Sequence, residues 1–222
     1  MLNNLFKRIT TSIFLIIILC FCLFYHELTW KSLVIFFSII CFFEFNNLIN
    51  KISRNKFTNI TLLFLIGLYL YFFYYFLIKI RFEFGEEVIL ILLIACIFSD
   101  IGGYVVGKSI GGPKLTSLSP NKTVSGAFGS ILFSVFGTTL FLFFLNKIDK
   151  NPLKFEFSFI VCVWLVLMSI YCQIGDLIIS YLKRKANLKD TGNMLPGHGG
   201  ILDRVDGIIF AIPFGVLTYF TL

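Results

Sequence analysis

Seven long apolar blocks, separated by short polar segments, constrain the fold of this chain more than any other feature of its sequence. They cover roughly residues 9–25, 30–49, 58–78, 87–106, 124–145, 157–182 and 207–222. A helix that spans a bilayer needs about 20 predominantly apolar residues. Since 58% of the 222 residues are hydrophobic, one water-soluble core could not bury them all. The sequence therefore predicts an all-α, polytopic integral membrane protein with seven transmembrane helices.

The positive charges between the apolar blocks predict how the chain is oriented. With a cytoplasmic N-terminus, the inside segments hold 13 of the 19 Lys and Arg residues and the outside segments hold 6. Cytoplasmic loops carry an excess of positive charge, so this split favours an N-terminus inside. The two longest polar loops, 107–123 and 183–206, then face the cytoplasm. We expect a multi-pass protein of a bacterial inner membrane with its active site on the cytoplasmic side, since no targeting segment is evident.

Charge and cysteine content argue against several other classes of protein. The net charge of +7 is spread over short loops, so we expect no nucleic-acid partner and attribute the charge to loops facing anionic lipid. All six cysteines lie in apolar blocks and none forms a CxxC pair, which argues against a disulfide framework or a zinc site.

The segment GGYVVGKS, residues 102–109, matches the P-loop pattern G-x-x-x-x-G-K-[ST]. A true P-loop lies between a short strand and a helix, so that its backbone N–H groups surround the phosphates. Here the preceding residues form the long apolar run EEVILILLIACIFSD, and no βαβ pattern follows. We therefore predict that the segment ends a membrane helix and that Lys108 does not hold a nucleotide as a P-loop lysine does.

Ionisable residues inside apolar blocks are costly there and indicate functional positions. Asp100 lies near the cytoplasmic end of the fourth block and Asp176 lies in the sixth. Gln173, Ser180 and Lys183 recur around Asp176 at helical spacing, so all four share one face of a helix. A polar seam between packed helices would explain the same stripe, and both interpretations stay open at this point.

The loop 183–206 ends in two carboxylates, Asp203 and Asp206. On a helix their spacing places both on one face, which suits a Mg²⁺ ion that also binds substrate phosphates. A helix-capping role for Asp203 is the alternative, although it leaves Asp206 and the intervening Arg204 unexplained. His198, flanked by glycines, is a candidate general base or phosphate donor.

The loop 107–123 leads into SLSPNKTVSG, residues 117–126. We expect Ser119 to cap a helix whose first residue is Pro120. The free N–H groups of that helix, with Lys122 and Thr123, would then form an anion site. A series of small residues follows and predicts a helix-packing face: Gly126, Gly129, Ser130, Ser134 and Gly137.

Carboxylates suited to Mg²⁺, lysines and helix N-termini suited to phosphates, and a membrane location point to one kind of chemistry. Phosphoryl or nucleotidyl transfer to a lipid relies on positioning and charge neutralisation and needs no covalent nucleophile. The residues by themselves predict this reaction class.

The segment SYLKRKANLKDTGNMLPGHGGILDRVD, residues 180–206, resembles the signature of the phosphatidate cytidylyltransferase (CDP-diacylglycerol synthase) family at every fixed position. The segment DIGGYVVGKSIGGPKLTSLSPNKTVSG, residues 100–126, resembles a second motif of that family. Gly103, Val124 and Ser125 stand where the family usually has Ala, Trp and Glu, so a role of that Glu does not carry over. The resemblance covers about the C-terminal 60% of the chain and implies a catalytic transmembrane domain over 86–222, while the apolar blocks predict N-terminal transmembrane helices over 1–85.

The resemblance implies a nucleotidyltransferase of phospholipid biosynthesis that converts CTP and phosphatidate into CDP-diacylglycerol and pyrophosphate with Mg²⁺. Its partners would be CTP, phosphatidate and membrane lipid, and a homodimer stays open. It assigns the metal to Asp203 and Asp206, with Asp176 supporting that site or a second cation. The implied catalytic residues are Asp176, Lys183, His198, Asp203 and Asp206. The implied substrate-binding residues are Asp100, Lys122, Thr123, Ser180, Arg184, Lys189, Asp190, Gly199, Gly200 and Arg204.

Three other functions compete with this one. A CTP-dependent kinase of a polyprenol or phytol would transfer the γ-phosphoryl group and release CDP. A CDP-alcohol phosphotransferase would need a D-G-x2-A-R…G-x3-D-x3-D pattern, which the sequence lacks. A transporter is suggested by Asp100 and Asp176, but related halves would be expected and the sequence contains no internal repeat.

Overall fold

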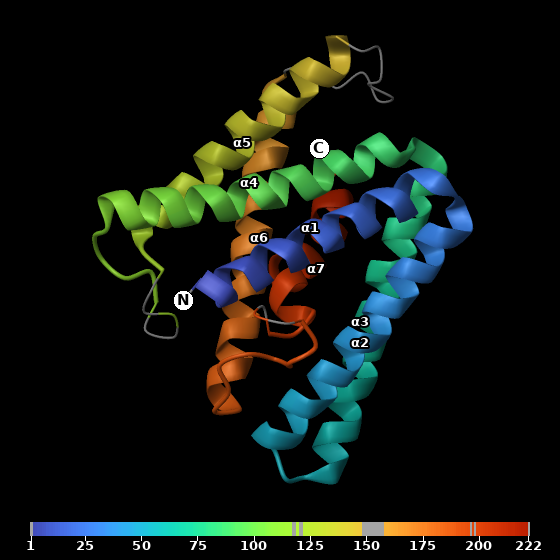
Figure 1. Ribbon diagram of the computed structural model, residues 1–222, viewed down its shortest axis with the longest axis vertical. Helices are drawn as coiled ribbons and strands as arrows, with labels where there is room; N and C mark the ends of the chain where they lie inside the picture. The colour runs from blue at the N-terminus through green and yellow to red at the C-terminus, as the bar shows by residue number, and fades with distance from the viewer. Residues whose placement is uncertain are drawn as a thin grey trace. The chain divides into compact units, whose positions relative to one another are not determined.

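The computed structural model describes residues 2–116, 119, 122–147, 158–195, 197 and 199–221, with side chains from residue 10 onward. These described residues form seven helices and no β-strand (Figure 1). The helices are α1 (Leu2–Tyr25), α2 (Glu27–Ile52), α3 (Lys56–Phe84), α4 (Glu86–Ile110), α5 (Val124–Lys147), α6 (Phe159–Lys185) and α7 (Leu202–Tyr219). Five of them, α2 to α6, are long and apolar enough to cross a bilayer. The predicted all-α membrane class is confirmed, whereas the number of spans and the orientation stay predictions.

Polar residues at the ends of the apolar runs provide the helix caps. The Ser158 hydroxyl accepts the N–H of Val161 at 3.3 Å, which satisfies one of the free N–H groups at the start of α6. At the other end of α6, Asn187 adopts φ +55, and the N–H of Leu188 donates to the carbonyl of Lys183 at 2.8 Å. This is a Schellman motif, and it ends α6 where the charged loop begins.

The start of α5 differs from the prediction. The helix begins at Val124, and Thr123 caps it instead of Ser119, because the Thr123 hydroxyl accepts the N–H three residues further on at 3.1 Å. Pro120, the predicted first helical residue, lies outside the described residues. The physical reason is a long-range pairing within the loop: Lys114 and Thr123 form an antiparallel bridge. Next to the bridge, the N–H of Leu115 donates to the carbonyl of Lys122 at 2.8 Å, so the helix begins after Thr123.

Packing divides the chain into two compact units. The first combines Met1–Ile78 with Leu182–Val205, and the second combines Lys79–Tyr181 with Asp206–Leu222. The loop after α6 therefore belongs with the N-terminal helices. The functional division of the chain at residue 85 stays a prediction.

In the first unit, α2 and α3 lie side by side (Figure 1). The indole N–H of Trp30 donates to the carbonyl of Leu77 at 3.4 Å. Near the other end of the pair, the Asn59 amide donates to the Asn50 side chain at 3.1 Å. Hydrogen bonds thus join both ends of this helical hairpin. They pair polar groups that would otherwise lack a partner in an apolar environment.

In the second unit, small residues allow α4 and α5 to approach closely. A Cβ on Gly102 would overlap the carbonyl oxygen of Gly129, and a Cβ on Gly129 would overlap the side chain of Val106. The predicted packing face is confirmed, since Gly126, Gly129, Ser130, Ser134 and Gly137 are all buried. Residues 102–109, which match the P-loop pattern, are helical throughout. They pack against a helix and do not form a phosphate-binding loop.

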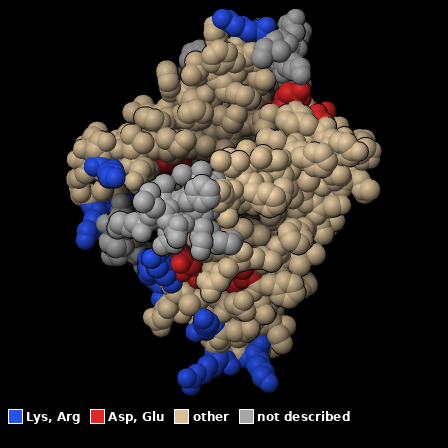
Figure 2. All heavy atoms as spheres, viewed as in Figure 1, with Lys and Arg blue, Asp and Glu red and all other residues tan. Residues whose placement is uncertain are grey.

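Hydrogen bonds between helices stabilise the interior of the second unit. The hydroxyls of Ser99 on α4 and Ser169 on α6 lie 2.8 Å apart, and the indole N–H of Trp164 on α6 donates to the carbonyl of Gly215 on α7 at 2.7 Å. The outer surface is mostly apolar, with Lys and Arg confined to a few clusters in the face that Figure 2 shows. This distribution suits helices whose outer faces contact lipid.

Candidate active site

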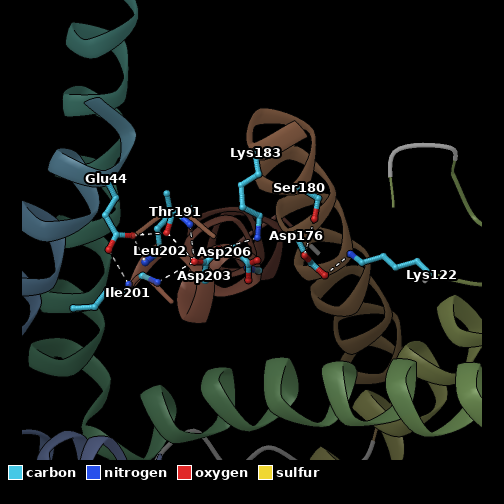
Figure 3. A network of polar contacts seen from close by, with 12 residues as sticks. Glu44, Lys122, Asp176, Ser180, Lys183, Thr191, Ile201, Leu202, Asp203 and Asp206 are labelled. Carbon is cyan, nitrogen blue, oxygen red and sulfur yellow. Dashed lines mark hydrogen bonds and ion pairs between the residues drawn. The ribbon is translucent and has the colours of Figure 1, made fainter. Parts of the chain in front are cut away.

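Asp203, the first of the two predicted metal-binding carboxylates, lies in the first turn of α7 and is the centre of a hydrogen-bonded cluster (Figure 3). Its Oδ1 accepts the ammonium of Lys183 at 2.7 Å. Its Oδ2 accepts the N–H groups of Thr191 at 2.8 Å and Gly200 at 3.0 Å. The side chain of Asp203 is only 5% exposed and that of Lys183 only 14%. The Asp203 carboxylate therefore connects the end of α6 with two points of the loop that follows it, Thr191 and Gly200.

The surroundings of Asp203 favour its ionised form. Burial alone would raise the pKa of its carboxyl, but the hydrogen bonds from Lys183, Gly200 and Thr191 and the charge of Lys183 hold that pKa below its ordinary value. Asp203 is therefore a carboxylate at neutral pH, as cation binding requires. The alternative interpretation stays open: Asp203 lies in the first turn of α7, where a carboxylate complements the helix dipole, although the Gly200 N–H that it accepts lies before the helix.

A second carboxylate joins this cluster, and the sequence reasoning missed it. Glu44 on α2 is buried and accepts the N–H groups of Ile201 and Leu202 at 2.9 Å each. It also accepts the hydroxyl of Thr191 at 2.6 Å. The N–H groups at the start of a helix have no partner within that helix, so Glu44 caps α7 from a different helix. The rule that an ionisable residue inside an apolar block indicates a functional position, already applied to two aspartates, would have found Glu44.

The two glycines predicted to bind substrate lie against these carboxylates. A Cβ on Gly200 would overlap Glu44 and Thr191, and a Cβ on Gly199 would approach Oδ2 of Asp203 to 2.8 Å. Gly199 also adopts φ +82, a left-handed conformation that favours glycine. Asp190, another predicted residue, lies beside Gly199. Both glycines thus allow the loop to close on the carboxylates, and their contact with substrate stays a prediction.

A separate cluster of predicted residues lies in the second unit (Figure 3). Lys122 forms an ion pair with Asp176 on α6, and the two side chains are 27% and 32% exposed. The hydroxyl of Ser180 donates to Asp176 over a long 3.4 Å. One turn earlier on α6, the Gln173 amide donates instead to the carbonyl of Ala127 at 3.3 Å. The predicted polar stripe therefore divides into a helix-packing part at Gln173 and a partly open part at Asp176.

The other predicted residues have varied surroundings. Asp100 is exposed, and the thiol of Cys172 donates to it over 3.8 Å. Asp206 follows Asp203 by one turn on α7. His198 lies outside the described residues, so its catalytic role stays a prediction. Three basic residues predicted to bind phosphate are exposed: Arg184, Lys189 and Arg204.

Among the residues that the structure describes, no three His, Cys, Asp or Glu side chains form a ready cation site. Mg²⁺ usually binds through one or two carboxylates and completes its coordination with waters and substrate phosphates. Asp203 and Asp206 provide two carboxylates on adjacent turns of α7. Among the described residues, Oδ1 of Asp203 accepts one hydrogen bond, from Lys183. A carboxylate oxygen has two lone pairs, so one of them stays available to a ligand. Binding of Mg²⁺ by these two carboxylates stays a prediction.

The fold and the polar clusters define a class: a polytopic helical membrane protein with buried carboxylates and lysines suited to phosphate chemistry. The comparison with protein families then specifies the family. The model of the Cytidylyltransferase family matches residues 50–222, and the chain belongs to this family. The match confirms the resemblance drawn from the sequence.

Several curated relatives are similar to this chain. The phosphatidate cytidylyltransferase of Bacillus subtilis (strain 168) is 36% identical over 166 residues, which are 72% of this chain and 59% of the relative. The phosphatidate cytidylyltransferase of Helicobacter pylori (strain J99) is 42% identical over 141 residues, 62% of this chain and 49% of the relative. That of Brucella suis biovar 1 is 43% identical over 129 residues, 58% of this chain and 45% of the relative. The chain spans about half the length of the curated relatives it matches.

Proposed function

We propose that this protein transfers the cytidylyl group of CTP to phosphatidate, which yields CDP-diacylglycerol and pyrophosphate. The observation that carries this proposal is the signature loop, folded onto the Asp203 carboxylate that pairs with Lys183. A phosphate oxygen of phosphatidate attacks the α-phosphorus of CTP. The bond between that phosphorus and the oxygen bridging to the β-phosphorus breaks, and pyrophosphate leaves with the bridging oxygen. Such a step depends on alignment and charge neutralisation.

Residues of both clusters have defined tasks in this reaction. The Lys122–Asp176 pair is partly exposed, so an incoming phosphate can take Lys122 as a partner and form a charge-assisted hydrogen bond. The exposed side chains of Arg184, Lys189 and Arg204 would hold the triphosphate or the lipid phosphate.

The metal would bind to the carboxylates of α7. Asp203 and Asp206 would hold Mg²⁺, with Asp176 supporting that site or a second cation. When bound, Mg²⁺ neutralises phosphate charge and allows two anionic substrates to approach each other. Lys183 would keep the Asp203 carboxylate in its orientation, since it already donates to Oδ1.

The products of the reaction test the proposal. Purified protein is incubated with Mg²⁺, phosphatidate and CTP labelled at the α-phosphate. We expect labelled lipid and an equal amount of pyrophosphate. Labelled CDP together with a phosphorylated polyprenol or phytol, in parallel reactions with those alcohols, would instead identify the lipid kinase. Label that stays in CTP with every acceptor would overturn the proposal.

The active site is proposed to lie on the cytoplasmic side of a bacterial inner membrane, because the charge split places both polar loops there. Single cysteines at Thr116 and Asn193 in a background without the six native cysteines report on the two loops. We expect an impermeant thiol reagent to label both sites in inverted vesicles and neither in intact cells. Labelling of either site from outside intact cells would overturn the topology.

A further inference from the structure

Glu44 is buried in one of the five helices that are apolar enough to cross a bilayer, and it is only 5% exposed. A carboxylate in such surroundings is costly unless hydrogen bonds satisfy its oxygens. Among the described residues, its three hydrogen-bond donors come from residues 191–202, far away in the sequence. Glu44 therefore connects α2 to the loop that carries the candidate active site.

The geometry of this connection is that of a helix cap. Oε1 of Glu44 accepts the N–H of Ile201, and Oε2 accepts the N–H of Leu202. These two N–H groups carry part of the positive end of the α7 dipole, which a negative charge stabilises. Asp203 is the next residue in the chain, so the contacts that fix Leu202 also fix the backbone from which the Asp203 side chain projects (Figure 3).

Thr191 links the two carboxylates a second time. Its hydroxyl lies 2.6 Å from Oε2 of Glu44 and 3.0 Å from Oδ2 of Asp203, and its N–H donates to Asp203. The hydroxyl has one hydrogen and donates to one carboxylate at a time. Gly192 adds a close contact, because a Cβ there would come within 2.7 Å of Glu44. The loop is thus shaped around both carboxylates together.

We infer that Glu44 is a positioning residue that holds the first turn of α7, and with it Asp203, in the orientation needed to bind cation and phosphate. It acts through Leu202 and Thr191 and does not itself contact the substrate. Glu44 precedes residue 50, where the family match begins, so the site depends on a residue outside the matched region. The inference rests on the proposed function only where turnover is the measurement.

The variant Glu44→Gln tests this role, because it keeps the size of the side chain but replaces one acceptor oxygen with an NH₂ group. That group cannot accept an N–H, so at least one bond to α7 is lost. Glu27→Gln is the matched control: the same change on the same helix, at a half-buried residue that pairs with Lys31. Both variants are measured for amide hydrogen exchange and for kcat, KM and Mg²⁺ dependence.

In folded Glu44→Gln we expect the amides of Ile201 and Leu202 to exchange about tenfold faster or more, since their acceptor is weakened. The amide of Leu195, which donates to the carbonyl of Gly199 at 2.9 Å, should keep its rate. Turnover should fall by about ten- to a hundredfold, and half-maximal activity should need more Mg²⁺, as for other residues that orient a metal ligand. Glu27→Gln should match the wild type in all measurements.

Unchanged exchange at Ile201 and Leu202 in folded Glu44→Gln would overturn the inference whatever the activity. A wild type without nucleotidyl transfer would refute the proposed function, while the exchange data would still decide the role of Glu44. If Glu44→Gln does not fold, Thr191→Val removes one bond to the carboxylate and is measured in the same way. Thr191→Ser, which keeps the hydroxyl, should restore turnover and exchange, and failure of that rescue would count against the inference.

Discussion

The two polar clusters differ in how firmly their charged groups are held. Around Asp203, three hydrogen bonds of 2.7–3.0 Å converge on a side chain that is 5% exposed. Around Asp176, one ion pair and one 3.4 Å hydrogen bond hold a side chain that is 32% exposed. The first arrangement fixes a carboxylate before any substrate arrives. The second can exchange its partner for a phosphate.

Under the proposed function, this difference predicts a division of tasks between the two clusters. Catalysis by positioning needs groups that do not reorganise during the reaction, which suits the Asp203 cluster. Substrate capture needs cations that an incoming anion can reach, which suits Lys122. The predictions below separate the two roles by measuring stability and activity together.

The largest effect should come from removing the two carboxylates of α7. Asp203→Asn and Asp206→Asn should each lower turnover by about 10²- to 10³-fold. The neutral amide would hold the cation less well, and the repulsion between two anionic substrates would then not be neutralised. The two variants should differ in stability. Asp203→Asn should also lower the free energy of unfolding by about 1–3 kcal/mol, since Thr191 and Gly200 lose a carboxylate acceptor.

Turnover with saturating CTP and thermal unfolding in the same detergent measure both quantities for the pair. Raised Mg²⁺ or Mn²⁺ should restore part of the activity of at least one variant. Near-wild-type activity of both variants, with an unchanged Mg²⁺ requirement, would place the metal site elsewhere.

The next effect compares the lysines of the two clusters. Lys183→Met leaves a buried carboxylate without its cation, so the free energy of unfolding should fall by about 3–5 kcal/mol. Lys122→Met breaks a partly exposed pair and should cost about 0–1 kcal/mol, while it raises the KM for a phosphate substrate. Chemical unfolding and steady-state kinetics of the two variants test this contrast. Equal losses of stability in the two variants would contradict the prediction that the Asp203 cluster is held more firmly than the Asp176 cluster.

The fold could be predicted from the sequence more fully than the site. Apolar runs long enough to span a bilayer as helices are local features of the sequence. They therefore predicted the approximate helix ranges without information on tertiary contacts. The start of α5 did not, because the pairing of Lys114 with Thr123 decides it. The site residues within 180–206 followed from their motif. Glu44 could have been found as an ionisable residue inside an apolar block. Its partner Thr191 could not, because it is 147 residues away in the sequence and periodicity carries no information on such a contact.

A smaller effect should come from adding one methyl group to the tightly packed cluster. In Gly200→Ala the new Cβ would overlap Glu44 and Thr191, so the loop must shift. Overpacking of this kind typically costs about 1–3 kcal/mol, and turnover should fall with it. Gly137→Ala, whose Cβ would overlap Phe98 at the α4–α5 contact, should lower stability by a similar amount but leave the KM for CTP unchanged. Thermal unfolding and CTP titrations distinguish the two, and a raised KM in both would contradict the separation of packing from the site.

The smallest effect should come from Lys108, although its motif looks the most like a nucleotide site. A P-loop lysine contacts phosphates from a loop whose N–H groups are free. Lys108 instead lies within α4, is exposed, and donates to the hydroxyl of Tyr104 at 3.3 Å. Lys108→Met should therefore retain at least about half of the wild-type turnover, as expected of an exposed contact outside both clusters, and should lose far less than Lys183→Met. The reverse order in the CTP assay, together with ATP hydrolysis by the wild type, would show that the segment binds nucleotide despite its helical structure.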